Sequence, residues 1–426
     1  MNQLKRVAII GGTRIPFCRS NSAYAQLSNL DMLTDTLQRL VDQHGIAGRK
    51  IDEVIAGAVT THSRDWNLAR EAVLSTNLSP ATPATTLQMA CGTSLQAALL
   101  VGARIATGQI DSAIAAGSDT TSDAPLVLQP RLTKRLLGAT QARSFSAKLR
   151  SFKGFRLSEL APQAPANGEP RTRLSMGQHC EMMAKEWEIS REAQDQWALE
   201  SHLKAAAAYE EGFFDDLLSP YQGVARDNNM RPDSSLDKLA ALRTVFDRSP
   251  QGTLTAANST PLTDGAAAVF LCSEDYASRN GLSVQAWLTL GRTSAVDFVG
   301  GEGLLMAPTV AVSELLQAAQ LSLQDFDYYE IHEAFAAQVL CTLKAWEDPV
   351  YCKEKLGLSQ ALGSIERSRI NVKGSSLAVG HPFAATGARI IGTLAKLLDK
   401  QNGQRGLISI CTAGGMGAAA ILESAN

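Results

Sequence analysis

Apolar and polar positions follow the same order twice along the chain, which predicts two related α/β halves. In the first half, a helical pattern over residues 33–44 leads through a glycine turn to an apolar strand at 51–57. In the second half, a helical pattern over 310–320 leads to a strand at 326–331. The two halves are only weakly similar residue by residue, so the prediction of a duplication rests on the order of their helices and strands.

Two candidate reactive groups occupy equivalent places in these halves. Cys91 follows an apolar segment and precedes a predicted helix that leads to a strand at 112–116. His381 precedes a predicted helix that leads to a strand at 406–410, and Cys411 follows directly. A parallel βαβ unit brings the start of its helix and the end of its next strand to one carboxyl edge of the sheet. We therefore expect these groups at carboxyl edges.

His332 and Glu333 extend this set, because they directly follow the strand predicted at 326–331. Open α/β sheets build their sites at such carboxyl edges. If the edges of the two halves face each other, the two histidines and the two cysteines converge. The sequence alone does not establish that they do.

A segment of different character separates the halves and predicts an inserted loop domain, basic and partly helical, at 122–252. The first half then covers 1–121 and is completed by about 253–280, and the second half covers 281–426. Residues 131–173 carry ten basic and two acidic side chains, a local balance of +8. The inserted segment therefore differs in charge from the rest of the chain. Residues 175–212 are expected to be helical, with Ser190 as a helix cap, and the insertion is expected to cover one face of the core.

Composition narrows the classes of function. The 426 residues are 45% hydrophobic, enough to fill the cores of two or three domains, and the formal charge of −2 argues against a general nucleic-acid binder. Seven cysteines without a CxxC pair fit free thiols in a reducing compartment. The apolar run Val7–Ile10 is too short for a secretion signal, and no stretch approaches transmembrane length. A cytoplasmic enzyme is the expectation.

Cys91 is the leading candidate for a nucleophile. A thiol at the start of a helix faces unpaired N–H groups and the positive end of the helix dipole, which favour the thiolate. The alternative is a small buried hydrophobic residue, a common role for intracellular cysteines. For His381, the alternative to a general base is a histidine that caps the helix, and for Cys411 it is packing beside a tight turn.

Five motifs, in order and from end to end of the chain, resemble those of thiolases. They lie at Met89–Ser94, Asn258–Ala268, His332–Ala336, Gly380–Arg389 and Cys411–Gly417. Most thiolases have asparagine where this chain has the histidine of the third motif, and this makes the chain similar to the thiolase subunit of fatty-acid β-oxidation complexes. The resemblance implies a thiolase-like α/β fold, with mixed five-stranded sheets in each half.

The resemblance also implies roles for individual residues. Cys91 would be the acylated nucleophile, His381 the base that takes its proton, and Cys411 the group that moves a proton at the substrate α-carbon. The backbone amides of Cys91 and Ala413 would form an oxyanion hole. Ala413 stands where glycine is common in the family, which puts the geometry of this turn in doubt but leaves a main-chain donor in place.

Further residues are implied at the edges of the site. His332 would hold a water or the thioester oxygen, and Glu333 would orient a histidine or a water. Ser259 would contact the pantetheine arm, beside an apolar wall of Ala334 and Phe335, although Ser259 also suits an ordinary turn. The motif that begins at His332 lacks the second histidine of HExxH, so no metal is expected.

The function implied is an acetyl-CoA C-acyltransferase that cleaves 3-ketoacyl-CoA, or runs the reverse Claisen condensation, with coenzyme A as substrate and no other cofactor. Alternatives are a ketoacyl-synthase-type condensing enzyme and a non-catalytic acyl-CoA-binding subunit. Expected partners are a second copy, as a dimer or a dimer of dimers, and a hydratase–dehydrogenase subunit. The basic segment has three alternatives: a solvated surface, counter-charge for the CoA phosphates, or a patch for a partner or an anionic membrane.

Overall fold

The computed structural model describes residues 4–401 and 403–425, and its strands form one ten-stranded mixed sheet. The short pairing of β1 with β7 divides it into two parts, which we call the two sheets. The strands are β1 (Val7–Arg14), β2 (Cys18–Arg19), β3 (Glu53–Gly57), β4 (Ala84–Thr86), β5 (Ser112–Asp119), β6 (Thr263–Ser273), β7 (Ala286–Ala295), β8 (Tyr328–Ile331), β9 (Arg405–Thr412) and β10 (Met416–Ser424). Their order is β4-β3-β5-β6-β1-β7-β10-β9-β8, and β2 pairs with β6.

The duplication predicted from the sequence is visible in this order. In the first half, β3 runs parallel to β4 and β5, and β6 runs antiparallel to β5 and β1. In the second half, β8 runs parallel to β9, and β10 runs antiparallel to β9 and β7. The fifth strand expected in the second half is reduced to a single bridge between Tyr329 and Ile370. The halves meet where Ala8 and Ile9 pair with β7.

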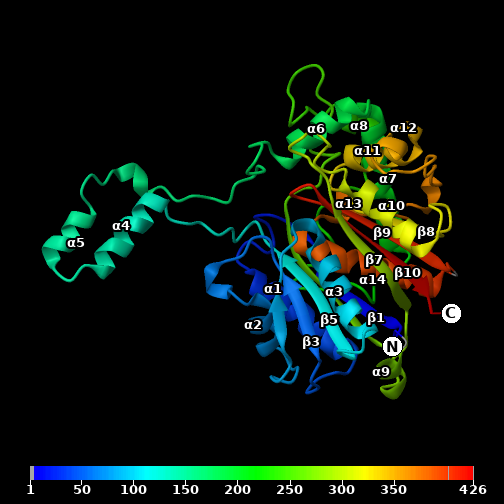
Figure 1. Ribbon diagram of the computed structural model, residues 1–426, viewed down its shortest axis with the longest axis horizontal. Helices are drawn as coiled ribbons and strands as arrows, with labels where there is room; N and C mark the ends of the chain where they lie inside the picture. The colour runs from blue at the N-terminus through cyan, green and yellow to red at the C-terminus, as the bar shows by residue number, and fades with distance from the viewer. Residues whose placement is uncertain (1–3, 402, 426) are drawn as a thin grey trace.

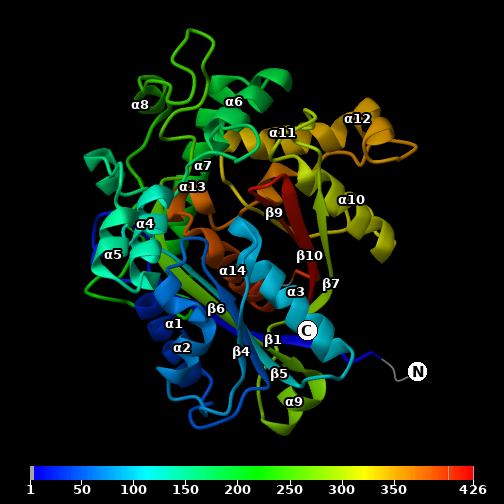
Figure 2. The same ribbon diagram turned by 60° about the vertical axis from the view of Figure 1, so that its left-hand side comes forward.

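Helices fill the space between the two sheets and cover their outer faces. Their bounds are α1 (Asn29–Gln43), α2 (Leu68–Leu74), α3 (Thr93–Ala106), α4 (Pro130–Gln141), α5 (Phe145–Ser151), α6 (Met176–Glu186), α7 (Arg191–Glu210), α8 (Leu236–Ala240), α9 (Glu274–Arg279), α10 (Ala307–Ala319), α11 (Ala336–Glu347), α12 (Pro349–Glu354), α13 (Ser376–Val379) and α14 (Thr386–Lys400), with short 3-10 turns η1 (Ser63–Asp65), η2 (Ala90–Gly92), η3 (Leu157–Leu160), η4 (Arg367–Arg369) and η5 (Phe383–Ala385). In the views of Figures 1 and 2, α3 and α14 lie between the two sheets.

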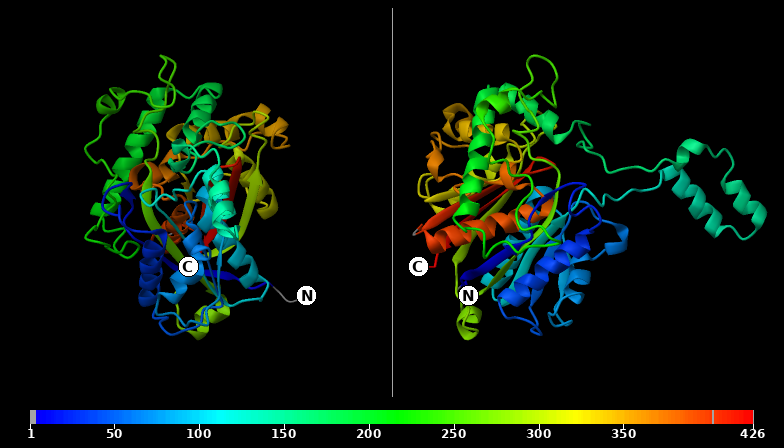
Figure 3. Two further views of the ribbon diagram at one scale, coloured as in Figure 1. Left: turned by 90° about the vertical axis from the view of Figure 1, so that its left-hand side faces the viewer. Right: turned by 180° about the vertical axis from the view of Figure 1, so that it is seen from behind.

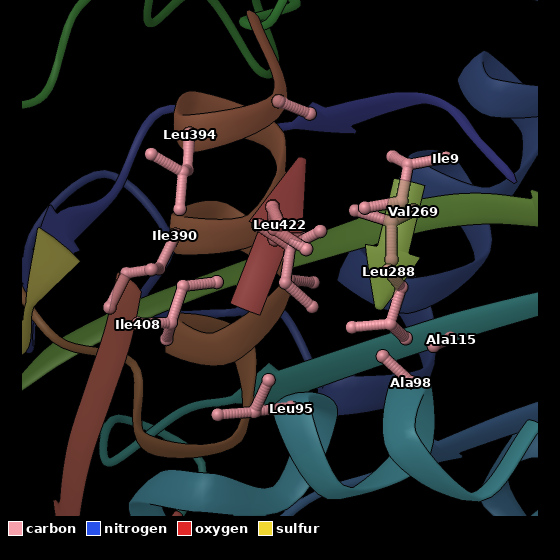
Figure 4. Close-up of a cluster of buried hydrophobic side chains, with 14 of the residues drawn as sticks. Ile9, Leu95, Ala98, Ala115, Val269, Leu288, Ile390, Leu394, Ile408 and Leu422 are labelled. Atoms are coloured by element: carbon pink, nitrogen blue, oxygen red, sulfur yellow. The ribbon is translucent and has the colours of Figure 1, made fainter. Parts of the chain in front are cut away.

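Successive side chains of a strand point to opposite faces of its sheet, and this alternation explains the layers. In β1, Ile9 packs in the central core with α3 and α14, whereas Ala8 and Ile10 face the outer core under α1 and α2. Figure 4 shows the central core, where Leu95 of α3 and Ile390 of α14 lie among side chains of both sheets. A third core joins the second sheet to α10 and α11. The two helices that follow the motifs at Cys91 and His381 are therefore the middle layer of the molecule.

The inserted segment divides into two parts. Its later helices, α6 and α7, pack against the second half, and Ser190 caps α7 as predicted by accepting from the Ala193 amide. The predicted helix at 175–212 is interrupted between α6 and α7. Helices α4 and α5 instead stand away from the body on an arm (Figures 1 and 3), residues 127–163, which Val127 and Gln163 close by pairing. The expectation that the insertion covers the core is therefore wrong for this arm.

Candidate active site

Cys91 lies in the turn η2, which its neighbours fold tightly between β4 and α3. Thr93 Oγ1 donates to the Ala90 carbonyl at 2.7 Å. Ala90 takes a φ of 44°, a left-handed conformation that is strained for a residue with a Cβ. A Cβ added to Gly92 would lie 2.9 Å from the Thr412 side chain, so the missing side chain lets this turn approach the end of β9. The first and second halves thus touch at Cys91.

His381 supplies the partner of this thiol. It lies between α13 and η5, where Gly380 takes a φ of 103° that favours glycine. The Nε2 atom of His381 lies 3.1 Å from Cys91 Sγ, and Nδ1 lies 2.5 Å from Thr386 Oγ1. The backbone amide of His381 donates to Thr263 Oγ1 at 2.7 Å, which ties the turn to β6 of the first half. The predicted convergence of Cys91 and His381 is present, although α14 begins only at Thr386.

Burial keeps this pair neutral. It is the main reason that the pKa of Cys91 is raised to about 12, with a further contribution from the Asp119 carboxylate. The backbone amides of Ala413 and Cys91 act in the opposite direction, and burial outweighs them. The pKa of His381 is lowered to about 3 by burial and by the Arg389 cation. The amide at the helix start favours the thiolate in the expected direction, but desolvation is the larger effect on the pKa of Cys91.

This neutral pair leads to a prediction for pH dependence. A base must be unprotonated to accept the thiol proton, and the lowered pKa of His381 keeps it so well below neutrality. We expect kcat/KM to show no histidine limb between about pH 7 and pH 5, where an ordinary histidine with a pKa of about 6.5 would titrate. Circular dichroism must show folded protein at each pH, because a buried neutral histidine loses stability as pH falls through its unfolded-state pKa. An acid limb near 6.5 would contradict the assignment.

His332 stands directly behind His381. It follows β8 as predicted, and the two rings lie 4.1 Å apart between centroids. Its Nδ1 lies 2.9 Å from Ser376 Oγ, whereas its Nε2 is buried and has no hydrogen-bond partner. Burial, His381 and the Arg389 cation lower the pKa of His332 far below its usual range. A neutral ring therefore presents one free nitrogen to the site.

Cys91, His332 and His381 also offer one sulfur and two nitrogens that all lie within 4.8 Å of one another. Among the residues that the structure describes, this is the group that could hold a metal ion. The 3.1 Å contact between Cys91 and His381 is explained by a hydrogen bond, which needs no ion. The expectation of no metal stays a prediction.

Cys411 and Ala413 approach the same thiol from the end of β9. Cys411 is buried, and its pKa is raised well above the usual value by burial and by Cys91. The backbone amide of Ala413 acts on the Cys91 sulfur, as an oxyanion donor would. The left-handed positions of this turn fall on Gly414 and Gly415, with φ of 78° and 70°. Ala413 is not among the left-handed residues of the described chain, so alanine fits there and the doubt about this turn is removed.

The structure also brings together the residues expected near pantetheine. Ser259 and Phe335 form a bridge between their backbones, and the Thr260 amide donates to the Ala334 carbonyl at 3.1 Å. Ser259, Ala334 and Phe335 are each 7% exposed. Ser259 Oγ has no hydrogen-bond partner, which leaves it free for a ligand. Their role in binding stays a prediction.

Glu333 has different contacts from those expected. Its carboxylate accepts from Trp197 Nε1, Ser201 Oγ, Asn371 Nδ2 and the Leu377 amide, at 2.7 to 3.2 Å. No recorded bond of this carboxylate, among the residues described, goes to a histidine. The four donors use both of its oxygens. Because Trp197 and Ser201 lie in α7 and Leu377 lies in α13, Glu333 links these two helices. The expectation that it orients a histidine or a water stays a prediction, and the contacts of Glu333 within the described chain give no direct bond to a histidine for it.

Asp119 is a buried acid that the sequence analysis did not single out. It ends β5 and accepts from the amides of Val59, Thr60 and Ala384. Burial raises its pKa to about 6. The bond to Ala384 fixes the 3-10 turn that follows His381. Its place at the carboxyl end of a central strand was the signal that could have identified it.

A cavity of about 570 Å³ opens beside the reactive thiol. Its lining includes Ala90, which directly precedes Cys91, and Ala413, together with the apolar side chains of Leu87, Met89 and Leu100, whereas Cys91 itself is not among the lining residues. An apolar space next to a nucleophile suits the tail of an acyl group. The fold and these groups define an α/β protein with a partly buried cysteine paired with a buried histidine, a second cysteine and main-chain oxyanion donors.

Comparisons with known proteins identify the thiolase family, which the sequence motifs also indicated. The model for the thiolase N-terminal domain matches residues 7–275, and the model for the thiolase C-terminal domain matches 287–424. The chain belongs to the thiolase family, and the thiolase fold predicted from the sequence is confirmed.

Particular relatives support this assignment. The chain is 42% identical over 424 residues to a 3-ketoacyl-CoA thiolase of Yersinia pestis, covering 98% of this chain and 97% of the relative. The Bacillus anthracis acetyl-CoA acetyltransferase has a similar structure, with a TM-score of 0.83, 29% identity and full coverage of both chains. Human mitochondrial 3-ketoacyl-CoA thiolase in complex with CoA gives a TM-score of 0.82 and 26% identity, again with full coverage of both chains.

Proposed function

We propose that this chain is a 3-ketoacyl-CoA thiolase that forms an acyl-enzyme on Cys91. The observation that carries the proposal is the 3.1 Å contact between Cys91 Sγ and His381 Nε2, with the thiol of Cys411 buried in the same site. A nucleophile paired with a base prepares covalent catalysis. The similarity to 3-ketoacyl-CoA thiolases over nearly the whole chain supports the substrate class.

The geometry accounts for each step of cleavage. His381 takes the proton of Cys91, and the sulfur attacks the 3-keto carbon while the Cys91 and Ala413 amides stabilise the oxyanion. The bond between C2 and C3 then breaks, and Cys411 donates a proton to the enolate carbon of the departing acetyl-CoA. A CoA thiol gives its proton to the Cys411 thiolate and attacks the acyl-enzyme, which releases the shortened acyl-CoA, and the departing Cys91 thiolate takes its proton back from His381. The reverse sequence is a Claisen condensation with the same groups.

Coenzyme A therefore acts as a substrate, and these steps move protons and an acyl group without any change of oxidation state. The ketoacyl-synthase alternative uses one cysteine and two histidines, so a working Cys411 argues against it. A non-catalytic acyl-CoA-binding subunit has no need for a paired nucleophile and base.

Product analysis tests the proposal and sets the acyl chain length. The purified protein, given CoA and a series of 3-ketoacyl-CoAs, should release acetyl-CoA and the acyl-CoA shortened by two carbons in equal amounts. The apolar cavity beside Cys91 leads us to expect turnover of chains longer than the four-carbon substrate. Absence of acetyl-CoA from every substrate would refute the function.

We also propose that the arm docks on an anionic membrane surface. It carries large exposed apolar side chains, among them Val127 (55%), Leu137 (55%), Phe145 (77%) and Leu157 (79%), between the cations of the basic segment. Apolar and cationic side chains together favour the interface of an anionic bilayer. Its position away from the body in Figures 1 and 3 argues against counter-charge for CoA bound at the same chain's site.

A prediction follows for the cations of the arm. Replacing Arg131, Lys134, Lys148 and Arg150 with glutamine should abolish salt-sensitive flotation with anionic vesicles and leave turnover of soluble substrates within about two-fold, since exposed charges act through screened fields. Neutral vesicles are the control. Unchanged flotation would indicate that the segment is only a solvated surface. A large rise in the KM for CoA would indicate instead that it binds the CoA phosphates.

For assembly, we propose a homodimer or a dimer of dimers, alone or with a hydratase–dehydrogenase subunit. Strand β4 ends the sheet order and leaves one edge without a neighbouring strand, a surface suited to pairing with a second copy. No helix of the described residues is both long and apolar enough to cross a bilayer. The seven free cysteines support a cytoplasmic location. Light scattering after size exclusion measures the oligomeric state.

A further inference from the structure

A group of buried polar side chains lies behind His332 and has no part in the steps described above. Arg389 and Glu330 are 5% and 1% exposed, and their nearest charged atoms stand 3.7 Å apart. Both carboxylate oxygens of Glu330 and the Nε of Arg389 have no hydrogen-bond partner. Burial raises the pKa of Glu330 to about 8 and lowers that of Arg389 to about 10, and the attraction between the two groups opposes both shifts.

Ser376 connects this pair to the reactive side chains. Its Oγ lies 2.9 Å from an Nη2 atom of Arg389 and 2.9 Å from Nδ1 of His332. A guanidinium can only donate, so Ser376 accepts from Arg389. The hydroxyl hydrogen of Ser376 needs an acceptor of its own, and the other neighbour of the hydroxyl, Nδ1 of His332, provides one when it is unprotonated. A neutral imidazole with an unprotonated Nδ1 carries its hydrogen on Nε2.

We propose that Arg389, held by Glu330 and acting through Ser376, is a positioning residue that fixes His332 in the tautomer with Nε2–H pointing into the site. Nε2 is the buried atom of His332 without a partner, and one ring nitrogen of His332 lies within 4.8 Å of Cys91 Sγ and of a ring nitrogen of His381. The other tautomer would present a lone pair, which repels a substrate oxygen instead of binding it. This inference rests on the proposed function and adds a role for His332 to it, in which Nε2–H donates to the thioester oxygen that becomes the enolate oxygen of the departing acetyl-CoA.

The decisive measurement is the tautomer itself. In wild-type protein labelled with 15N-histidine, the His332 signals should be those of the Nε2–H form, assigned by their loss in His332→Asn. Ser376→Ala removes the link and should give a mixture of both tautomers. It should also lower kcat by the factor to which the Nε2–H fraction falls, about two-fold for an equal mixture, because the remaining enzyme lacks one oxyanion donor, while the KM stays unchanged.

Matched variants separate positioning from packing. Ser409 is also a buried serine, on β9 directly beside the site, and its hydroxyl has no partner. Ser409→Ala should leave both tautomer and kcat unchanged. Arg389→Lys keeps the cation and should retain more of the Nε2–H form than Arg389→Gln. If Arg389→Gln fails to fold, the double variant Glu330→Gln/Arg389→Gln, which leaves no lone buried charge, replaces it in the comparison.

Two results would overturn the inference: a wild-type His332 with its hydrogen on Nδ1, or Ser376→Ala with an unchanged tautomer and kcat. Its failure is distinguishable from failure of the proposed function by acyl transfer to Cys91. That transfer uses the Cys91 and Ala413 amides, so Ser376→Ala should still form the covalent adduct. Lack of an adduct in wild-type protein would instead refute the proposed function and leave the tautomer result standing.

Discussion

Replacing Cys91 with alanine is expected to abolish the covalent adduct and to lower kcat by about 10⁴-fold or more, as removal of a nucleophile does in other enzymes. Wild-type protein incubated with acyl-CoA in the absence of free CoA should gain one acyl mass, located by peptide mass spectrometry on the peptide that contains Cys91. The reason is geometric: among the seven free cysteines, it is Cys91 whose sulfur has a recorded hydrogen bond to a histidine.

A second buried cysteine provides the control for this experiment. Cys272 is fully buried in β6, packs in the outer core under α1, and has no place in the proposed steps. Cys272→Ala should reduce the free energy of unfolding by about 1 kcal/mol while adduct and turnover persist. Acyl label on another cysteine, or none under turnover conditions, would contradict the assignment of the nucleophile.

The placement of these groups could be predicted because it follows from topology. Cys91 precedes a helix, while Cys411 and His332 come at or just after the ends of strands, so the carboxyl-edge rule applies to all three. The packing of α3 against α14 then brings the two edges together. Five motifs spread over the whole chain also indicated the thiolase family, and the family in turn predicted the fold.

The protonation of the site could not be predicted in the same way. A sequence shows that Cys91 precedes a helix, but the pKa of the thiol depends on how much water the folded chain removes, and that is a property of tertiary packing. Glu333 illustrates the same limit, because its four donors come from segments between Trp197 and Leu377. The arm also escaped prediction, since its charge indicated an unusual segment without showing that α4 and α5 leave the body.

The other large effect concerns Cys411. Cys411→Ala should still accept an acyl group at Cys91 from a simple acyl-CoA, because Cys91 needs only His381 and the two backbone amides for that step. It should lose proton exchange at the α-carbon and overall thiolysis by at least about 10²-fold, the effect of a missing general acid–base group. Burial and Cys91 raise the pKa of Cys411 well above its usual value, so at neutral pH it is a thiol with a proton to give to the enolate carbon.

The measurement for Cys411 is therefore paired. Mass spectrometry follows the adduct on Cys91, and NMR follows deuterium uptake into acetyl-CoA in heavy water. Cys91→Ala should lose the adduct, whereas Cys411→Ala should keep the adduct and lose the exchange, so the two variants fail in different assays. Near-normal exchange and turnover in Cys411→Ala would mean that this cysteine only packs beside the Gly414–Gly415 turn. The ketoacyl-synthase alternative, with its single cysteine and two histidines, would then be the better description of the site.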